Sequence, residues 1–202
     1  MTTLTLYTDF VCPFCFVAEQ STVAKLQRTY DLTIDWRGYE LHPDTPPGGM
    51  ALAEKFGAAR VPAMRAHMRQ FAEGFGITDM QFRERSPNTR RALAMAEHAR
   101  DQGKLDAFRA LAMDAHWRRG MDLEGDADLR TLAAEAGLDP DAALAASRDP
   151  ALFSRIDARR AEAEARGVTG IPTFVMDGRG VVGCQPYETL AAFVEAGGAK
   201  KR

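Results

Sequence analysis

Hydrophobic and polar positions alternate over residues 3–7 and again over residues 32–40. This period of two indicates half-buried strands. Between these segments, from residue 13 through residue 26, apolar side chains recur at helical spacing, which predicts a helix. A strand, a helix and a second strand, joined by a connection long enough for a crossover, favour a parallel β-α-β unit in residues 1–42.

The pattern changes over residues 43–167, where strand signals disappear and helix starts and stops follow one another. We expect an all-helical insertion whose alanine-, leucine- and methionine-rich helices pack as a bundle. The predicted helices begin at Pro62, at Asn88 or Thr89, and at Lys104, Asp126, Pro140 and Pro150. Asp139 and Asp149, each followed by proline, are expected N-caps. One apolar stripe is expected to lie in the core of its helix: Met64, Met68, Phe71 and Phe75.

Strand character returns at residues 173–177, and we predict a tight turn over 178–180 that leads into a second strand at 181–183. A final amphipathic helix is predicted from Pro186 to Gly197. The order of elements is therefore β-α-β, insertion, β-β-α. We expect residues 1–42 and 168–202 to form one domain and residues 43–167 to form the inserted one.

Composition narrows the class of protein. The 202 residues are 46% hydrophobic, enough for a substantial core, and the net charge of −2 gives no electrostatic reason to bind nucleic acid or an anionic membrane. No apolar run approaches the ~20 residues that span a bilayer. The N-terminus lacks the basic and apolar regions of a secretion signal, so we expect a cytoplasmic protein.

Three cysteines in a cytoplasmic protein do not indicate a structural disulfide framework. Cys12 and Cys15 flank Pro13 and Phe14 where the first strand turns into the helix, and Pro13 suits the first helical position. Unsatisfied N–H groups at a helix start favour a thiolate at Cys12. Cys15 lies one turn further in and is expected to be less exposed. This asymmetry suits a nucleophilic outer thiol and a resolving inner thiol.

Two other interpretations of the pair are half of a zinc site and an inert buried pair. A four-ligand zinc site needs two more ligands, and no second close pair exists among the remaining candidates, which are Cys184, His42, His67, His98 and His116. We therefore expect no metal. Cys184 has two open interpretations: a small buried side chain at the end of the hairpin, or a third redox-active thiol.

Several motifs, spread over nearly the whole chain, resemble the DsbA-like thioredoxin-fold family. The likeness is to its cytosolic FrnE-type branch, which is related to the 2-hydroxychromene-2-carboxylate isomerases and the kappa-class glutathione transferases. The motifs are residues 9–15, Glu40-Leu41, Pro46-Pro47-Gly48, Asn88-Thr89, residues 167–172 and residues 183–186. The resemblance implies an α/β thioredoxin fold with a large helical insertion.

The resemblance also implies a cis peptide bond between Ile171 and Pro172 that faces the dithiol and offers backbone groups to an extended substrate. Four residues are candidates for the substrate cleft: Asn88, Thr89, Thr173 and Gln185. Glu19 lies one turn after Cys15 and is a candidate proton carrier, with a solvated helix glutamate as the alternative. Asp9 is interpreted as a cap or turn residue rather than as a proton carrier.

The expected function is a thiol:disulfide oxidoreductase that acts through a mixed disulfide at Cys12, resolved by Cys15. Expected partners are protein or small-molecule disulfides, with glutathione as a co-substrate or a thioredoxin system as electron donor or acceptor, and no prosthetic group. One alternative is a glutathione-dependent isomerase or transferase on a small aromatic or polyketide-like substrate. Another is a chaperone-like binding module. The sequence favours the first because both thiols are present.

Overall fold

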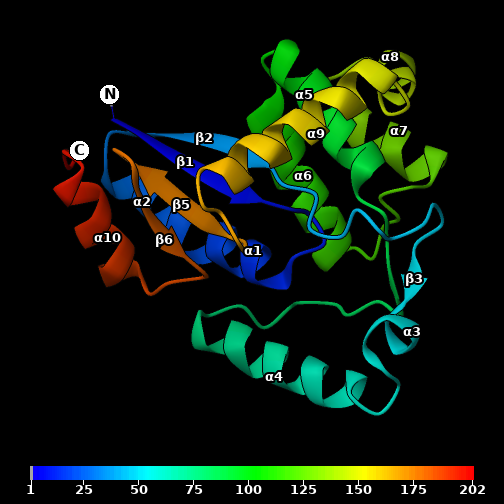
Figure 1. The fold of residues 1–202 in the computed structure, drawn as a ribbon, viewed down its shortest axis with the longest axis horizontal. Helices are drawn as coiled ribbons and strands as arrows, with labels where there is room; N and C mark the ends of the chain where they lie inside the picture. The colour runs from blue at the N-terminus through cyan, green and yellow to red at the C-terminus, as the bar shows by residue number, and fades with distance from the viewer. Residues whose placement is uncertain (1) are drawn as a thin grey trace.

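A four-stranded mixed sheet with strand order β2-β1-β5-β6 lies at the centre of the computed structural model, which describes residues 2–202 (Figure 1). Its strands are β1 (Thr2–Thr8), β2 (Leu32–Gly38), β5 (Thr173–Met176) and β6 (Arg179–Val182). β1 and β2 run parallel, whereas β5 pairs antiparallel with both β1 and β6. The predicted parallel β-α-β unit and the C-terminal hairpin are confirmed.

A helical segment with a π turn in its middle connects β1 to β2. It consists of α1 (Pro13–Ala18), the π-helical segment η1 (Glu19–Val23) and α2 (Ala24–Thr29). The sequence pattern predicts a continuous helix here and gives no sign of the π turn. Because such turns change the direction in which the following side chains point, and occur often at functional sites, the π turn matters for the position of Glu19.

Helices cover both faces of the sheet. Leu4 and Leu6 of β1 lie in the main apolar core, and α10 (Tyr187–Ala196) contacts α2 on that side. Tyr7 points the other way and packs in a separate cluster with Ala163 of α9 (Pro150–Ala165). In Figure 1, α9 passes in front of the sheet, while α1 and α2 lie behind it. This arrangement follows from the alternation of side chains along β1.

The larger part of the insertion is a group of helices, as expected. They are α5 (Arg90–Asp101), α6 (Leu105–Trp117), α7 (Asp126–Glu135), α8 (Pro140–Ala146) and α9. The predicted N-caps are confirmed, because the Asp139 and Asp149 carboxylates accept backbone N–H groups at 2.7 and 2.8 Å. No helix within residues 2–202 is both long and apolar enough to cross a bilayer.

One apolar core runs from the sheet into these helices, through residues such as Leu93 and Phe108. The two-domain division of the chain is therefore a proposal that rests on the order of elements. It assigns residues 43–167 to the insertion and the flanking segments to the thioredoxin-like part.

The expectation of an all-helical insertion is wrong in one region, which we call the arm (residues 50–86). It contains two short antiparallel strands, β3 (Met50–Ala51) and β4 (Arg85–Ser86), and two helices, α3 (Leu52–Phe56) and α4 (Val61–Gly74). The sequence pattern does not reveal these strands, because two residues are too few to show an alternation of hydrophobic and polar positions. Figure 1 shows α4, with α3 at one end, set apart from helices α5 to α9.

The turn of the C-terminal hairpin also differs from the prediction. Asp177 and Gly178 form it, with φ angles of +50° and +72°, and Arg179 already pairs with Met176 in the ladder. Asp-Gly is a preferred pair for two-residue hairpin turns because both positions need a positive φ. The prediction of a turn over 178–180 is therefore wrong, because the turn begins one residue earlier, at Asp177.

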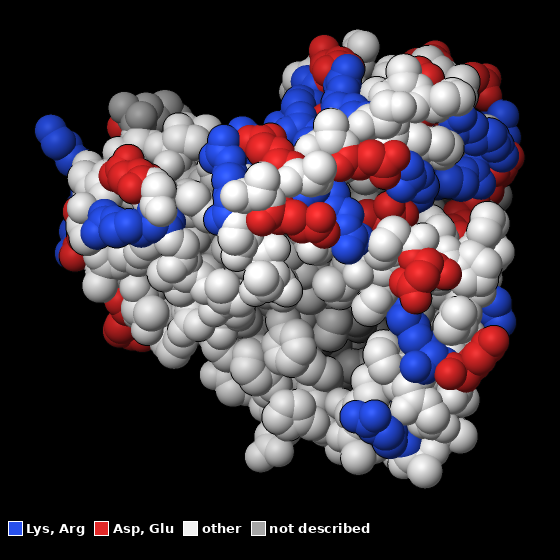
Figure 2. All heavy atoms as spheres, viewed as in Figure 1, with Lys and Arg blue, Asp and Glu red and all other residues white. Residues whose placement is uncertain are grey.

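The predicted core stripe on α4 is core only in part: Met68 is buried, and Phe71 and Phe75 are partly buried against the main core. Met64 is 36% exposed, and the ring of Phe71 lies 5.1 Å from the ring of Phe14 beside the dithiol. Figure 2 shows charged side chains gathered over the helices above the sheet, and a hollow with few charges in the lower half of the same face. The apolar side of α4 therefore faces the dithiol region.

Candidate active site

Cys12 is the N-cap residue of α1, as the sequence predicts, with Pro13 in the first turn. Its Sγ accepts a hydrogen bond from the backbone N–H of Cys15 at 3.4 Å. Its own N–H donates to the Asp9 carbonyl at 3.1 Å, which fixes the turn that leads out of β1. A sulfur held in this way lies at the first turn of α1, where backbone N–H groups have no partner within the helix.

The two thiols of the pair differ in their surroundings. Both are free, and Cys15 is 0% exposed, beneath Cys12 at 2%. Cys12 lines a cavity and Cys15 does not. Burial, reinforced by the neighbouring Cys12 sulfur, raises the pKa of the Cys15 thiol well above its usual value. Both thiols are therefore buried, but Cys12 borders the cavity and Cys15 is enclosed by the protein.

The segment before β5 lies across from the dithiol. The Ile171–Pro172 peptide bond is cis, and the Ile171 carbonyl accepts the Cys12 thiol hydrogen at 3.7 Å. The Pro172 carbonyl accepts a hydrogen bond from the Gly183 N–H at 2.7 Å. This bond ties the proline segment to the end of the C-terminal hairpin. Ile171 lines the same cavity as Cys12.

Cys184 follows Gly183 and lies near this proline segment. It is half-buried, and burial together with the nearby Cys12 raises the pKa of the Cys184 thiol to about 12. At neutral pH it is therefore protonated and a poor nucleophile. These surroundings fit the interpretation of Cys184 as a small half-buried side chain better than that of a third redox thiol.

Glu19 is buried beneath the dithiol rather than solvated. Its Oε1 accepts hydrogen bonds from the Thr8 hydroxyl at 2.9 Å and the Trp36 indole N–H at 3.3 Å. Its Oε2 accepts from the Arg109 guanidinium of α6 at 2.7 Å. Burial raises the pKa of Glu19, and the Arg109 charge opposes that shift. Glu19 is the first residue of the π turn, which is where the helix departs from regular α geometry.

The Thr8 hydroxyl connects Glu19 to Cys15, because it also lies within hydrogen-bonding reach of the Cys15 thiol. Neither Thr8 nor Arg109 is among the site residues predicted from the sequence. Arg109 lies ninety positions from Glu19, and no local pattern relates two residues at that separation.

Asp9 links the active-site turn to the rest of the molecule. Its Oδ2 accepts from the Leu41 N–H at 2.8 Å and from the Thr89 hydroxyl at 3.1 Å, while Oδ1 is buried without a partner. Burial, with a smaller contribution from the charge of Glu40, raises the pKa of Asp9 to about 7. Asp9 thus joins β1 to the end of β2 and to the start of α5.

The substitution Asp9→Asn is expected to stabilise the protein above neutral pH. The folded state holds the Asp9 proton up to a pKa of about 7, whereas an unfolded aspartate loses it near 4, so the wild type loses up to about 4 kcal/mol between these values as the pH rises. Asparagine keeps an acceptor for Leu41 and Thr89 and stays neutral. Denaturant unfolding at pH 4.5 and pH 8 measures the change. Equal pH dependence in the two proteins would contradict the assignment.

The four cleft candidates use their polar groups within the fold, and none of them lines the cavity beside Cys12. Asn88 donates to the Thr45 carbonyl at 2.6 Å, and Thr89 is buried against Asp9. Thr173 donates to the Gly170 carbonyl at 2.6 Å and Gln185 to the Val182 carbonyl at 2.7 Å. In the structure, each of these four side chains is hydrogen-bonded within the fold and lies outside the cavity.

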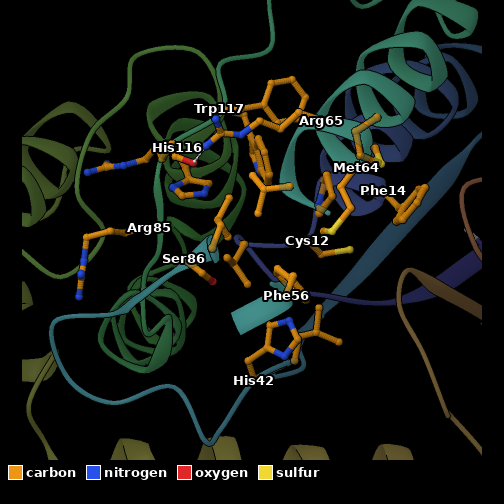
Figure 3. Close-up of a pocket in the computed structure, with 18 of the residues that line it drawn as sticks. Cys12, Phe14, His42, Phe56, Met64, Arg65, Arg85, Ser86, His116 and Trp117 are labelled. Atoms are coloured by element: carbon orange, nitrogen blue, oxygen red, sulfur yellow. Dashed lines mark hydrogen bonds between the residues drawn. The ribbon is translucent and has the colours of Figure 1, made fainter. Parts of the chain in front are cut away.

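A cavity of about 370 Å³ opens beside Cys12, between the dithiol and the arm. Figure 3 shows Cys12 and Phe14 on one side of it and His116 and Arg85 on the other. Its walls come from α4, from the end of α6 and from the loop after β2. Sequence patterns do not reveal this cavity, because its walls come from segments far apart in the chain.

No cluster of three or more histidine, cysteine or acidic side chains within residues 2–202 is arranged to hold a metal ion.

Comparison with known proteins places the chain in a family. The DSBA-like thioredoxin domain matches residues 3–195. The 2-hydroxychromene-2-carboxylate isomerase of Sphingobium xenophagum is 26% identical over 179 residues, which cover 87% of this chain and 89% of the isomerase.

Two solved structures share the fold. The probable DsbA oxidoreductase SCO1869 from Streptomyces coelicolor has a TM-score of 0.82 at 24% identity, covering 98% of this chain and 90% of the other. The cytosolic disulfide reductase DsbM from Pseudomonas aeruginosa with GSH has a TM-score of 0.66 at 22% identity, covering 96% and 98%. The thioredoxin-like fold with its insertion is thus confirmed, and the chain belongs to the DSBA-like thioredoxin domain family.

Proposed function

We propose that the protein is a thiol:disulfide oxidoreductase whose redox centre is the Cys12–Cys15 pair. The Cys12 thiolate attacks a disulfide sulfur and forms a mixed disulfide, and the first thiolate leaves with the electron pair of the broken bond. The Cys15 thiolate then attacks Cys12 and releases the second thiolate. The substrate gains two electrons and the protein holds a Cys12–Cys15 disulfide. The observation that carries the proposal is a thiol at a helix N-cap that borders a cavity, next to a second thiol that is fully buried.

The buried contacts supply a path for the proton of Cys15. The Thr8 hydroxyl donates to Glu19, so its oxygen is free to accept the Cys15 thiol proton as Thr8 passes its own proton to the carboxylate. Arg109 remains beside Glu19 and holds the carboxylate in place. Deprotonation matters because burial keeps Cys15 in the unreactive thiol form. Glu19 therefore acts as the proton carrier for the resolving step.

Glutathione is the proposed co-substrate, and the support for it comes from one structural relative. A structural relative named as a cytosolic disulfide reductase is described with GSH. A cytoplasmic location agrees with that relative and with the use of a reactive rather than a structural thiol pair. Protein disulfides and a thioredoxin system are the other proposed partners, since they react by the same thiol–disulfide exchange. The direction of electron flow depends on the reduction potential of the partner relative to that of the Cys12–Cys15 pair.

A second candidate function is a glutathione-dependent isomerase or transferase on a small molecule. The cavity beside Cys12 and the isomerase relative favour it. In this reaction neither Cys12 nor Cys15 is oxidised, and only the site at residue 12 is needed. This candidate therefore predicts that Cys15→Ser retains activity. A chaperone-like binding module predicts that both single serine variants retain activity.

The variant Cys15→Ser tests the mechanism by trapping its intermediate. With the resolving thiol removed, Cys12 is expected to accumulate as a mixed disulfide with glutathione after exposure to oxidised glutathione, visible as an added mass of one glutathione on the peptide that contains residue 12. Wild type under the same conditions should instead carry the internal disulfide. Turnover of insulin or of a glutathione mixed disulfide by Cys15→Ser at the wild-type rate would contradict the proposal.

A further inference from the structure

We propose that Asp9 and Glu40 hold one proton between them behind the turn that carries Cys12, and that loss of this proton opposes formation of the Cys12 thiolate. Asp9 is a positioning residue, because it does not line the cavity and acts through Cys12. The use of Cys12 as a nucleophile rests on the proposed function, whereas the shared proton does not depend on it. Three features support the proposal: the contacts of the Asp9 backbone, two buried oxygens without partners, and the charges around them.

Asp9 is attached to both cysteines through its main chain. Its carbonyl accepts the Cys12 N–H at 3.1 Å, and its backbone lies within hydrogen-bonding reach of the Cys15 thiol. The carboxyl group is fully buried, and Oδ2 accepts from the Leu41 N–H and the Thr89 hydroxyl. Charges act strongly on one another over such short distances inside a protein. An ionised Asp9 therefore places a negative charge beside the turn that carries the dithiol.

Two carboxylate oxygens within residues 2–202 are buried without a partner, and they belong to neighbouring segments. They are Asp9 Oδ1 and Glu40 Oε1, on residues that are 0% and 1% exposed. Asp9 follows β1 and Glu40 follows the parallel strand β2. Consecutive residues at the start of α5 hold the other two oxygens, Thr89 that of Asp9 and Arg90 that of Glu40. The charge of Glu40 acts on Asp9, so the two carboxyl groups lie close together.

One proton accounts for both unpartnered oxygens. A buried polar atom without a hydrogen bond costs free energy, and two buried carboxylates that lie close together oppose each other's ionisation. Asp9 Oδ2 already accepts two hydrogen bonds, so a proton on Asp9 belongs on Oδ1, where it forms an O–H donor. Glu40 is the acceptor that this donor needs, because its charge is balanced by the Arg90 guanidinium at 2.6 Å.

The surroundings of the pair set the pH at which this proton is lost. Burial raises the pKa of Asp9 to about 7, where its hydrogen bonds oppose the shift and the charge of Glu40 adds to it. Lys55 of α3 is a cation on which the Asp9 charge acts, so it favours loss of the proton. The other charged or titratable groups on the surrounding elements are Cys12 and Cys15 of α1, His42 and Asp44 after β2, Arg90 of α5, and Asp157 and Arg160 of α9. The proton is therefore held below about pH 7 and lost above it.

The pH thus decides whether one or two negative charges lie behind the active-site turn. Below neutral pH the pair carries one, which the Arg90 guanidinium balances. Above neutral pH Asp9 adds a second, and a negative charge disfavours a thiolate nearby. We therefore expect the reactivity of Cys12 to rise less steeply with pH than that of an isolated thiol. A broadened titration of this kind is typical of two coupled groups.

The coupling is measured by the rate at which iodoacetamide alkylates Cys12 as the pH is raised. A Cys15→Ser background leaves one thiol in the peptide that contains residue 12, and the mass of that peptide reports the reaction. Asp9→Asn keeps an acceptor for Leu41 and Thr89 but cannot ionise. We expect equal rates with and without Asp9→Asn near pH 5.5, and a roughly three- to tenfold faster reaction with it near pH 8.5. Asp141→Asn is the matched control, because Asp141 is an exposed aspartate of α8, and it should leave the profile unchanged.

Glu40→Gln tests the shared proton from the other side. Removal of the neighbouring charge should let Asp9 ionise at a lower pH, so the slowing of Cys12 alkylation should begin at a lower pH than with Glu40 present. If one variant does not fold, the other decides. If neither folds, the profile of the protein with Asp9 and Glu40 intact decides, because a single-proton titration of Cys12 would overturn the inference.

Two results with folded variants would also overturn the inference. One is the same pH profile with and without Asp9→Asn, and the other is a rate that Asp9→Asn changes by the same factor at every pH, which indicates a structural effect. Alkylation needs no disulfide exchange, so the proposed function is judged separately. A protein with the expected pH dependence that reduces no disulfide would contradict the proposed function alone. One that reduces disulfides through Cys12 with equal profiles would contradict this inference alone.

Discussion

Cys12→Ser is expected to reduce disulfide reduction by on the order of 10⁴-fold or more, the size of effect that follows the loss of a covalent nucleophile. A serine hydroxyl is hardly ionised at neutral pH and cannot form a disulfide, so no mixed disulfide arises. The fold should persist, because serine is a favourable N-cap and can accept the same N–H of Cys15. Initial rates with insulin and with a glutathione mixed disulfide measure the loss.

The matched control is Cys184→Ser, the same exchange at the third thiol. Cys184 is half-buried and its thiol stays protonated, so this variant is expected to keep wild-type rates. If Cys12→Ser kept a substantial part of the activity while Cys184→Ser lost it, the nucleophile would be Cys184 and the proposed roles would be wrong.

Arg109→Met is expected to destabilise the protein by about 3–5 kcal/mol, because it leaves the Glu19 carboxylate buried without its ion-pair partner. For a chain of this length that corresponds to a fall in Tm of roughly 10 °C. Methionine keeps much of the volume and the straight chain of arginine, which limits any cavity. Thermal unfolding followed by circular dichroism at pH 7 measures the change.

The double variant Glu19→Gln/Arg109→Met separates the lost charge pair from lost packing. A neutral glutamine side chain no longer needs the guanidinium and can keep the contacts with Thr8 and Trp36, so most of the stability should return. Resolution of the mixed disulfide should stay slow in this variant, since the amide that replaces the Glu19 carboxylate cannot take the proton of Cys15. We therefore expect the double variant to regain most of the thermal stability that Arg109→Met loses, while the rate at which the mixed disulfide is resolved stays below that of the wild type. A double variant as unstable as Arg109→Met would point to packing instead.

Local sequence signals determine much of the fold and the first part of the site. The period of two identifies β1 and β2, the Asp-Pro pairs mark the starts of α8 and α9, and the strand-to-helix turn places Cys12 at a helix N-cap. Each of these features depends on residues a few positions apart. That is why they can be recognised before any tertiary contact is known.

The parts that the sequence does not reveal depend on contacts between distant segments. Arg109 reaches Glu19 from α6, and the arm closes a cavity against Trp117. Met64 shows how the same pattern can mislead, because an apolar stripe facing a cavity has the same helical spacing as one facing the core. The π turn at residues 19–23 likewise leaves no trace in the hydrophobic pattern.

Equilibrating the protein in glutathione buffers of increasing oxidising strength, then alkylating the remaining thiols and mapping them by peptide mass, tests most directly whether the two sulfurs form one redox couple. We predict that Cys12 and Cys15 become protected together in a single two-electron transition, through a bond between them, while Cys184 remains open to alkylation under denaturing conditions. Independent loss of the two thiols, or a pair that stays fully alkylated across the whole range of glutathione potentials, would contradict the account.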